Sequence, residues 1–589
     1  MNADRPRGGW LPRWGRIAAV APRPDHAGGE ASRWYADAAV GVGLFAVFYL
    51  VVALATSGRT HQLHPQVSLA YRVLPAYAAF SLARMLAAYI LSLAFSLAYG
   101  YVAANNRWAE RILVPILDIL QSIPILSFLP SVVLALAGLF PHSTLGVELA
   151  SIILVFTSQA WNMTFSFYNS LLTVPHELRE VARLYRLSWW QRFRQLDLPS
   201  AVSGLVWNSM MSWAGGWFFL MYAEMFTMGD RSFQVLGLGS YLQQAANAGD
   251  GRAEVAGLLA LVLLIVGLDQ LVWRPLIAWA DKFKLETVGN QAPPRSAVLM
   301  LLRRSVLIDW LTRRVFAPIV ERVDRSLAGA PPQERGGGAR PRPWGRAAAW
   351  VGGLLAAALA GDGVAHAMRL LVSMPAHDAA RLPLAALLST LRVAAALGIG
   401  AAWCVPVGVF IGYNREWAER LQPVVQILAS FPATAIYPLL ALAFGALGWA
   451  SILLMLLGTQ WYVLFNVIAG AMAIPQDLRE ATALFGLGRL ERWRTLILPA
   501  IFPYLITGLI TAAGGAWNAT IAAEYVVTSH GRTISTLGLG ALIAESSGRA
   551  EYGLLLASTL ALSLIVVVVN RFFWRRLYRL AETRYTMLA

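Results

Sequence analysis

Four charged residues lie within strongly apolar stretches of the sequence. Arg84 and Arg392 stand at matching places early in two such stretches, and Glu224 and Glu524 stand late in two others. An ionisable group inside a bilayer is costly and usually pairs with an opposite charge. We therefore predict the ion pairs Arg84–Glu224 and Arg392–Glu524, at outer-leaflet depth, as helix clamps. The alternative is that each arginine faces an oxyanion, because a guanidinium fork matches planar and tetrahedral anions.

Uncharged polar and tryptophan side chains also occur inside apolar stretches. Polar groups at such places face a cavity or another helix. For any single residue, helix–helix packing is a sufficient explanation. As a group they predict a cavity lined from the fourth and fifth apolar segments of each half of the chain. The candidates for this path are Gln159, Trp161, Asn162, Asn208, Trp217, Gln460, Trp461, Asn466, Trp517, Asn518 and Thr520.

Sequence patterns of catalysis are absent. The only lysines, Lys282 and Lys284, lie in no GxxxxGK[ST] motif, so no P-loop is expected. GxSxG and HExxH do not occur either, and the single cysteine, Cys404, allows no disulfide. His61 and His64 lack an evident third metal ligand, so we expect them in a solvated loop. The chain is therefore predicted to be no enzyme and to hold no metal or cofactor.

The composition is that of an integral membrane protein. Of 589 residues, 57% are hydrophobic and 14% are charged, against about 25% charged in a soluble domain. The net charge of +16 lies in short Arg-rich blocks beside apolar runs, which encodes membrane orientation rather than nucleic-acid binding. A membrane helix needs about 20 apolar residues. Twelve candidate spans lie near 38–57, 78–104, 113–140, 145–173, 200–226, 254–280, 346–361, 386–412, 422–446, 449–474, 500–528 and 553–574.

Basic residues predict the orientation of these spans. With the N-terminus in the cytoplasm, 37 Lys and Arg residues fall on the inner side and 8 on the outer side. This asymmetry follows the positive-inside rule. It predicts a multi-pass protein of the bacterial inner membrane with both termini in the cytoplasm.

The chain repeats itself. The segments 175–199 and 475–499 are identical at 11 of 25 positions, and "LGLG" occurs at 236–239 and 537–540. Both copies have the same inside–outside sense, which predicts a parallel repeat about an axis normal to the membrane. We expect an all-α fold with domains 1–37 (cytoplasmic tail), 38–280 (first repeat), 281–345 (cytoplasmic linker) and 346–589 (second repeat).

Each repeat carries a polar, proline-bounded insert on the cytoplasmic side. Pro175 and Pro475 open the inserts, and acidic residues follow in a first helical turn, where they suit the helix dipole. Leucines at helical spacing, among them Leu184 and Leu484, are expected to anchor a short amphipathic helix, and the LxLP ending at Pro199 to turn the chain back into the next span. The insert residues of interest are Glu177, Arg179, Glu180, Ala182, Leu184, Arg186, Asp477, Arg479, Glu480, Ala481, Leu484 and Gly486.

These inserts resemble the E-A-A-x3-G-x9-I-x-L-P motif of permease subunits of ATP-binding-cassette importers. Glu480, Ala481, Gly486 and Pro499 match it, whereas Val181 and Arg186 replace its first Ala and its Gly in the other copy. The resemblance implies a type I importer-like fold and a coupling helix that docks on an ATPase. It implies two separate ATPase subunits carrying ATP and Mg²⁺, a periplasmic solute-binding protein and a lipid environment. The details are most similar to the nitrate, taurine and alkanesulfonate subfamily.

Two prolines interrupt the third span of each repeat, Pro124 with Pro130 and Pro432 with Pro438, and predict a flexible break there. The linker predicts an amphipathic helix on the inner membrane face or a polar extension of the sixth span, followed by disorder over 327–343.

A twelve-span secondary transporter and a membrane scaffold remain as alternatives to the importer. They leave the paired inserts unexplained, and the sequence does not name the solute.

Overall fold

The computed structural model describes most of the chain from residue 66 onward. The described residues are 66–122, 124–140, 143–228, 231–283, 297–305, 310, 312–327, 358, 361–362, 364–430, 433, 437, 440, 448–527 and 533–584. Several predicted segments lie outside them: the N-terminal tail, the span at 38–57, most of the span at 346–361, His61, His64, and all of the predicted disordered segment 327–343 except Leu327, which is helical.

The first repeat is a series of long helices interrupted by one helical hairpin and one β-hairpin. A three-residue 3₁₀ turn, Tyr71–Val73, leads into the first long helix. The helices and strands are α2 (Leu74–Asn105), α3 (Arg107–Ser122), α4 (Ile125–Leu139), α5 (Leu145–Leu172), α6 (His176–Leu184), α7 (Trp189–Arg192), the π-helical turn η3 (Phe193–Asp197), α8 (Leu198–Ala223), β1 (Met225–Met228), β2 (Arg231–Gln234), α9 (Leu238–Ala248), α10 (Gly251–Leu268), the π-helical turn η4 (Asp269–Trp273) and α11 (Arg274–Ala280).

The second repeat follows the same order of elements, except that no counterpart of α4 is among its described elements. It consists of α16 (Ala376–Tyr413), α17 (Arg415–Ser430), α19 (Gly448–Met472), α20 (Gln476–Leu484), α21 (Arg489–Arg492), the π-helical turn η8 (Trp493–Ile497), α22 (Leu498–Ala523), β3 (Tyr525–Val527), β4 (Thr533–Ser535), α23 (Leu539–Gly548), α24 (Tyr552–Val569), the π-helical turn η10 (Asn570–Trp574) and α25 (Arg575–Arg584). The duplication predicted from the sequence is thus also a duplication of secondary structure.

The fold is helical apart from two short antiparallel pairs in the described residues. Strand β1 pairs with β2, with Met225 opposite Gln234, and β3 pairs with β4, with Tyr525 opposite Ser535. The sequence analysis expected helices alone and missed both pairs. Each follows closely on the helix that ends at Ala223 or Ala523, and each leads into a helix that begins at the second leucine of the "LGLG" motif, Leu238 or Leu539.

Six helical segments among the described residues are long and apolar enough to cross a membrane. They are Tyr71–Asn105, Gly251–Phe283, Ala376–Tyr413, Trp449–Met472, Arg489–Ala523 and Tyr552–Ala581. Helices α5 and α8, at the predicted spans 145–173 and 200–226, are continuous over 28 and 26 residues. They are not among the six, because polar side chains lower their hydropathy.

The third predicted span, 113–140, is not one helix. Helix α3 ends at Ser122 and α4 begins at Ile125, with Pro124 in extended conformation before it. A proline has no N–H for an intrahelical hydrogen bond, and its ring disfavours helix at the preceding residue. The sequence analysis expected a break but kept one span. In the second repeat α17 ends at Ser430, and Pro432 and Pro438 lie outside the described residues.

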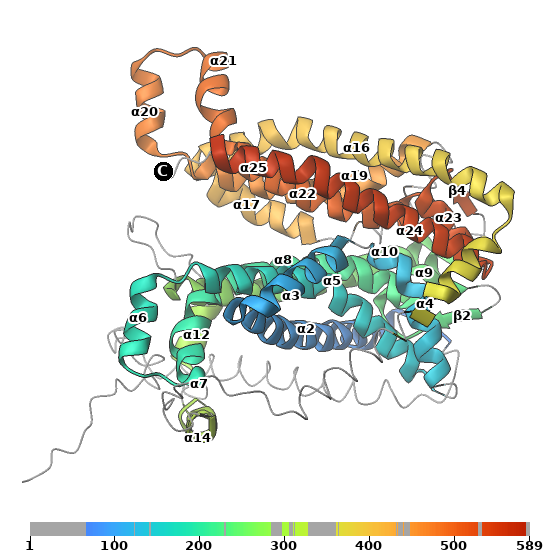
Figure 1. Ribbon diagram of the computed structural model, residues 1–589, viewed down its shortest axis with the longest axis horizontal. Coiled ribbons are helices and arrows are strands. Elements are labelled where there is room, and N and C mark those ends of the chain that lie inside the picture. Colours follow the sequence, from blue (N-terminus) through green and yellow to red (C-terminus); the bar gives the residue numbers. More distant parts are fainter. Residues whose placement is uncertain are drawn as a thin grey trace, which may run out of the picture. The chain divides into compact units, whose positions relative to one another are not determined.

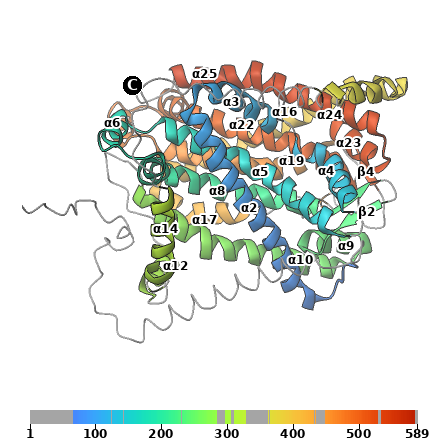
Figure 2. The ribbon, with the colours of Figure 1, turned by 60° about the horizontal axis from the view of Figure 1, so that its bottom comes forward.

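The chain divides into two compact units, of which the larger contains most of both repeats. It comprises residues 50–173, 204–273 and 339–589. Helix α2 packs on α5, and α16 packs on α19, which packs on α22 (Figures 1 and 2). Apolar side chains from both repeats, including Leu129 and Leu154 of the first and Leu454 and Trp517 of the second, form one core cluster. The two repeats therefore share a core.

The smaller unit contains the first helical hairpin and part of the linker. It comprises residues 1–49, 174–203 and 274–338. In the linker, α12 (Ala297–Arg304), the π-helical turn η6 (Thr312–Phe316) and α14 (Ala317–Leu327) are helical. Asp324 of α14 forms an ion pair with Arg194 and accepts a hydrogen bond from Trp190 Nε1 at 2.9 Å. The linker helix α14 thus contacts the α7 side of the hairpin, a contact that the sequence did not predict.

Candidate functional site

A buried ion cluster joins three segments of the first repeat. Arg84 of α2 places Nη1 2.7 Å from Oε1 of Glu224, and its Nη2 lies 2.9 Å from Oε1 of Glu148 on α5. Ser81 donates to the same Glu224 oxygen at 2.6 Å. Only 1% of the Arg84 side chain is exposed. The Arg84–Glu224 pair expected from the sequence is present, and Glu148 is a second acidic partner that the sequence analysis missed.

The second repeat forms a simpler version of this cluster. Arg392 Nη1 lies 2.9 Å from Glu524 Oε1, and Ser389 donates to the same carboxylate oxygen at 2.7 Å. The Arg392–Glu524 pair expected from the sequence is therefore also present. Gly448 stands where the first repeat has Glu148, so the second cluster lacks the extra carboxylate. The Arg392 side chain is 12% exposed.

The "LGLG" motif closes each cluster from the other side. Glu224 Oε2 accepts the backbone N–H of Gly239 at 2.6 Å, and Glu524 Oε2 accepts that of Gly540 at 2.9 Å. A carboxylate at a helix N-terminus is stabilised by the unpaired N–H groups there. A side chain at Gly237 or Gly538 would overlap the carboxylate. The motif therefore lets the chain approach the buried glutamate closely.

The two inserts fold as helical hairpins rather than as single helices. Helix α6 ends at Leu184 and α20 at Leu484, and a short second helix follows each. Leu187 N–H bonds to Ala182 O at 3.1 Å and Leu487 N–H to Thr482 O at 3.2 Å, which closes a Schellman-type turn. The residue before each leucine, Arg186 or Gly486, has positive φ, 52° and 62° respectively. The chain turns here, and not at the LxLP ending, which continues through η3 or η8 into the next long helix.

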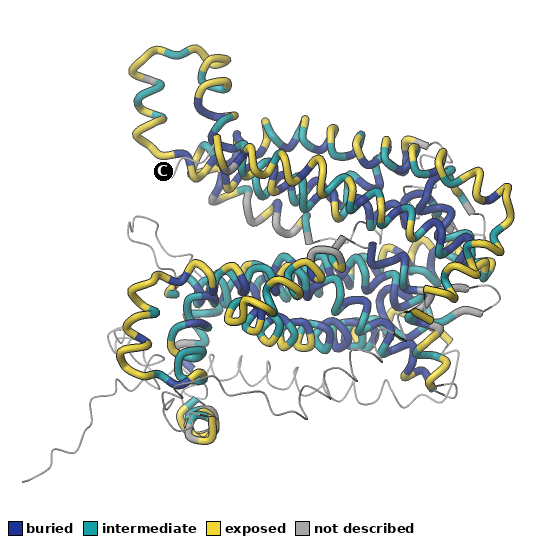
Figure 3. The backbone as a smooth tube through the Cα atoms, viewed as in Figure 1, coloured by how far each residue is buried: buried dark blue, intermediate teal, exposed yellow. Residues whose placement is uncertain are grey.

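The tips of both hairpins are apolar and exposed. Leu184 and Tyr185 are 81% and 77% exposed, and Leu484 and Phe485 are 88% and 81% exposed. Figure 3 shows exposed residues along α20 and the turn that follows. The expectation that Leu184 and Leu484 anchor the inserts is wrong, because each lies at the end of its first helix, where the chain turns away from any packing surface.

The second hairpin is held to the membrane helices by an arginine. Arg479 donates to the carbonyl oxygens of Tyr413 and Ala471, at 2.9 and 2.7 Å. Its guanidinium also lies 4.4 Å from the centroid of the Tyr413 ring. Tyr413 ends α16, and Ala471 lies in the last turn of α19. Arg479 is thus an anchor rather than part of the exposed face.

The acidic residues of the motif remain exposed on both hairpins. Glu180 lies 3.3 Å from His176, and Glu480 accepts from Gln476 at 2.8 Å. Glu177 and Asp477 are exposed as well, whereas Ala182 is buried and Ala481 is partly buried.

At the start of the next long helix of the first repeat, burial raises the pKa of the Asp197 carboxyl. The nearby charges of Arg192 and Arg179 act in the opposite direction.

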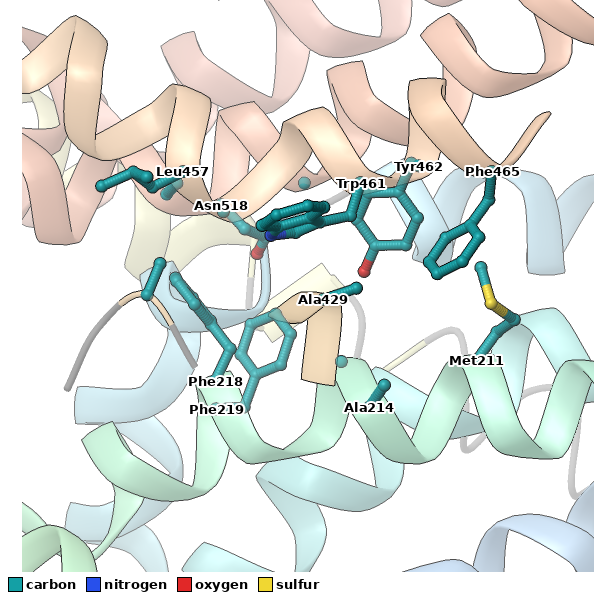
Figure 4. Close-up of a pocket in the computed structure, with 15 residues that line it drawn as sticks. Met211, Ala214, Phe218, Phe219, Ala429, Leu457, Trp461, Tyr462, Phe465 and Asn518 are labelled. Atoms are coloured by element: carbon teal, nitrogen blue, oxygen red, sulfur yellow. The ribbon is translucent and has the colours of Figure 1, made fainter. Parts of the chain in front are cut away.

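A cavity lies between α8 of the first repeat and α19 of the second. Its empty space, counted to its open mouth, is about 730 Å³. Trp461, Tyr462 and Phe465 point into it from α19, and Phe218 and Phe219 face them from α8 (Figure 4). It is further lined by Met211, Ala214, Gly215, Ala429, Ala433, Leu457, Gly458, Gly515, Asn518 and Ala519. No charged residue is among these fifteen.

The expected path residues divide among several places. Trp461 and Asn518 line this cavity, and the Asn518 side chain accepts the Ile125 N–H at 2.6 Å, which links the two repeats. Asn162 and Asn208 line a separate polar hollow on α5 and α8, and Trp217 lines a third hollow with Trp273.

The remaining expected path residues lie outside these three hollows. Gln159 donates to Met85 Sδ, Trp161 packs on Phe95, Asn466 donates to Tyr462 O, and Thr520 donates to Trp517 O. Trp517 is in the core, and Gln460 is buried.

The sequence analysis also missed four of the five aromatic rings of the cavity. Phe218 and Phe219 directly follow Trp217, and Tyr462 directly follows Trp461. Their apolar character resembles that of any membrane helix, so sequence spacing gave no reason to single them out. The available signal was the density of aromatic residues beside the two predicted tryptophans.

The architecture is that of a duplicated helical membrane protein. Residues 96–272 and 404–585, together more than half of the chain, match the family of binding-protein-dependent transport system inner membrane components. The chain belongs to this family, with two copies of its domain in tandem. It is thus a multi-pass inner membrane component, and not the ATPase, of such a transport system. Among the described residues no group of three or more potential metal ligands occurs.

Permeases of other organisms are similar to parts of the chain. A putative ABC transporter permease of Methanocaldococcus jannaschii is 27% identical over 202 residues, which cover 33% of this chain and 73% of the relative. A bicarbonate transport system permease of Synechococcus elongatus is 28% identical over 184 residues, 31% of this chain and 64% of the relative. A taurine transport system permease of Escherichia coli is 27% identical over 156 residues, 26% of this chain and 57% of the relative.

Proposed function

We propose that this chain is a fused permease that forms the whole translocation path of an ATP-driven importer for a small anionic solute. Two separate ATPase subunits, which carry ATP and Mg²⁺, bind the α6–α7 and α20–α21 hairpins on the cytoplasmic side. A periplasmic solute-binding protein delivers the solute to the outer side. In this arrangement both termini are cytoplasmic, in keeping with the distribution of basic residues along the chain.

The exposed apolar tips of the hairpins carry this proposal. Large apolar side chains that stand free on a polar hairpin mark a surface for another protein. Leu184 with Tyr185, and Leu484 with Phe485, present such a pair once in each repeat. Burying one leucine side chain contributes roughly 1.5–3 kcal/mol. Two hairpins of the same form fit a pair of identical grooves, as a dimeric ATPase would offer.

The anchoring of the second hairpin supports a mechanical role. Arg479 ties α20 to the ends of α16 and α19. Helix α19 also carries Trp461 and Tyr462 into the cavity between the repeats. A displacement of the hairpin by a bound ATPase would therefore move helices that line the cavity, which is the coupling that alternating access requires. We propose that ATP-driven closure opens the path outward and that hydrolysis resets it.

The relatives support a small anion as the solute. Three of them are named as permeases for bicarbonate, nitrate and taurine. We accordingly propose that this chain imports a sulfonate, taurine or nitrate. The clusters around Arg84 and Arg392 act in it as helix clamps, because their guanidinium groups are satisfied by Glu148, Glu224 and Glu524.

The docking of the ATPase can be tested by charge placed at a hairpin tip. The substitution Leu484→Asp should reduce copurification of the ATPase subunit at least tenfold, because a carboxylate in an apolar groove is costly. Val372→Asp is the control, since Val372 is as exposed as Leu484 but lies on the predicted outer side. Vanadate-sensitive ATP hydrolysis should decline with copurification. A Leu484→Asp protein that keeps its ATPase would refute the docking role, and uptake without any ATPase would favour the secondary transporter.

A further inference from the structure

We infer that the solute carries a flat aromatic ring and that the cavity between α8 and α19 binds this ring. The inference rests on the proposed transport function and narrows its substrate class. It separates an aryl-bearing organic solute from bare inorganic anions such as nitrate or bicarbonate. The observations that carry it are the rings, the lack of charge and the unequal contributions of the two repeats.

Aromatic side chains dominate opposite walls of the cavity. Phe218 and Phe219 stand on α8 in an edge-to-face arrangement, with centroids 5.1 Å apart and planes at 73°. Trp461, Tyr462 and Phe465 face them from α19 (Figure 4). Aromatic rings prefer offset-stacked or edge-to-face neighbours, and such contacts contribute about 0.5–1.5 kcal/mol beyond simple burial. A flat ring placed between these walls would find such neighbours on both sides.

Within the described part of the chain, the cavity offers an inorganic anion no counter-charge. None of its fifteen lining residues is charged. An unpaired charge removed from water is very costly, so a small anion that fills the cavity would remain unpaired. The polar side-chain groups of the lining residues are the Tyr462 hydroxyl, the Trp461 indole N–H and the Asn518 carboxamide. Asn518 Nδ2 donates one hydrogen to Gly514 O at 3.0 Å, and its second N–H can donate to one polar substituent of the solute.

Three of the five rings have no aromatic counterpart in the other repeat, whereas Trp461 and Phe465 match Trp161 and Phe165. The matching positions in the other repeat are Asn518 for Phe218, Ala519 for Phe219 and Asn162 for Tyr462. Each repeat thus supplies rings from a different helix, α8 in the first and α19 in the second. A symmetric path for a simple anion would have no need of this difference, whereas a single asymmetric site for one ring accounts for it.

Small residues keep the cavity open between the rings. Gly215 on α8 and Gly515 on α22 both line it. A methyl group at Gly215 would come within 3.4 Å of the Tyr462 hydroxyl, and one at Gly515 within 3.5 Å of the Tyr462 ring. Larger side chains at these glycines would occupy the space assigned to the solute.

Binding to the full chain in nanodiscs tests the inference. The probes are benzenesulfonate and methanesulfonate, which share a head group and differ in the ring. We expect saturation-transfer NMR to show magnetisation transfer from the protein to the ring protons of benzenesulfonate. Methanesulfonate at the same concentration should show at least fivefold less. Absence of transfer to benzenesulfonate, or equal transfer to both probes, would overturn the inference.

Variants locate the bound ring. Trp461→Leu should reduce the benzenesulfonate signal at least fivefold, and Gly215→Leu should do the same by filling the cavity. Trp207→Leu is the matched control, because Trp207 is on α8 but is exposed and lines none of the three hollows. Equal signals from Trp461→Leu and Trp207→Leu would place the ring elsewhere. If either cavity variant fails to fold, the comparison of the two probes on the native chain still decides whether the protein binds an aromatic ring.

Failure of this inference is distinguishable from failure of the proposed function. If the chain copurifies with an ATPase and imports taurine or nitrate but does not bind benzenesulfonate, the proposed transport function stands and the proposed aromatic site is refuted. If the chain binds benzenesulfonate but neither associates with an ATPase nor requires ATP for uptake, the proposed aromatic site stands and the proposed ATP-driven mechanism is refuted.

Discussion

The turn of each hairpin gives the sharpest prediction, because one copy has glycine and the other has arginine in the same backbone conformation. Arg186 and Gly486 have φ of 52° and 62°. A residue with a Cβ in this region costs about 1–2 kcal/mol. A glycine loses more conformational entropy than a residue with a side chain when the turn forms, and this difference costs about 0.4–1 kcal/mol of free energy. The difference leaves glycine favoured at this position by roughly 0.8 kcal/mol.

We predict that Arg186→Gly stabilises the first hairpin turn and that Gly486→Arg destabilises the second by the same amount. The Arg186 side chain is exposed, and no atom lies within 4 Å of a Cβ built at Gly486. Neither exchange therefore removes a contact or creates a clash. A free energy of about 0.8 kcal/mol corresponds to a factor of about four in the opening equilibrium.

Hydrogen–deuterium exchange measures this opening in the full chain. The reporters are the amides of Leu187 and Leu487, whose hydrogen bonds to Ala182 O and Thr482 O close the turns. Leu187 should exchange about fourfold more slowly in Arg186→Gly, and Leu487 about fourfold faster in Gly486→Arg. The control Arg183→Gly removes the same charge from helical backbone and should speed exchange. Changes in the same direction in both hairpins, or slower exchange in the control, would refute the argument from backbone conformation.

Three further predictions follow from buried or bridging contacts. Arg84→Met should lower the thermal midpoint in scanning fluorimetry more than Arg392→Met, because it leaves two carboxylates unpaired rather than one; breaking such a pair costs about 3–5 kcal/mol. Gly538→Ala should also destabilise, by roughly 1–3 kcal/mol, since its methyl group overlaps the buried carboxylate, whereas Gly548→Ala has open space and should not. Asp324→Ala should speed limited tryptic cleavage of the linker helix severalfold, and unchanged cleavage would mean that the bridge does not hold it.

The sequence by itself determined the class of protein and the existence of two copies. Candidate membrane spans follow from composition, and a predicted orientation follows from the placement of arginines; both are local properties. The duplicated inserts were visible as identity at fixed spacing. The two ion pairs were predictable as well, because an arginine and a glutamate in apolar surroundings need opposite charges and their depths could be matched from the order of the spans.

Only the tertiary structure decided which side chains meet. Glu148 joins Arg84 because α5 packs on α2, and Leu484 stands free because the chain turns at Gly486 before any helix covers it. The aromatic cavity needs α8 of one repeat to face α19 of the other. Apolar residues in a membrane helix look alike in sequence, whether they face lipid, another helix or a hollow. Their role depends on packing between distant segments, which spacing along one helix does not specify.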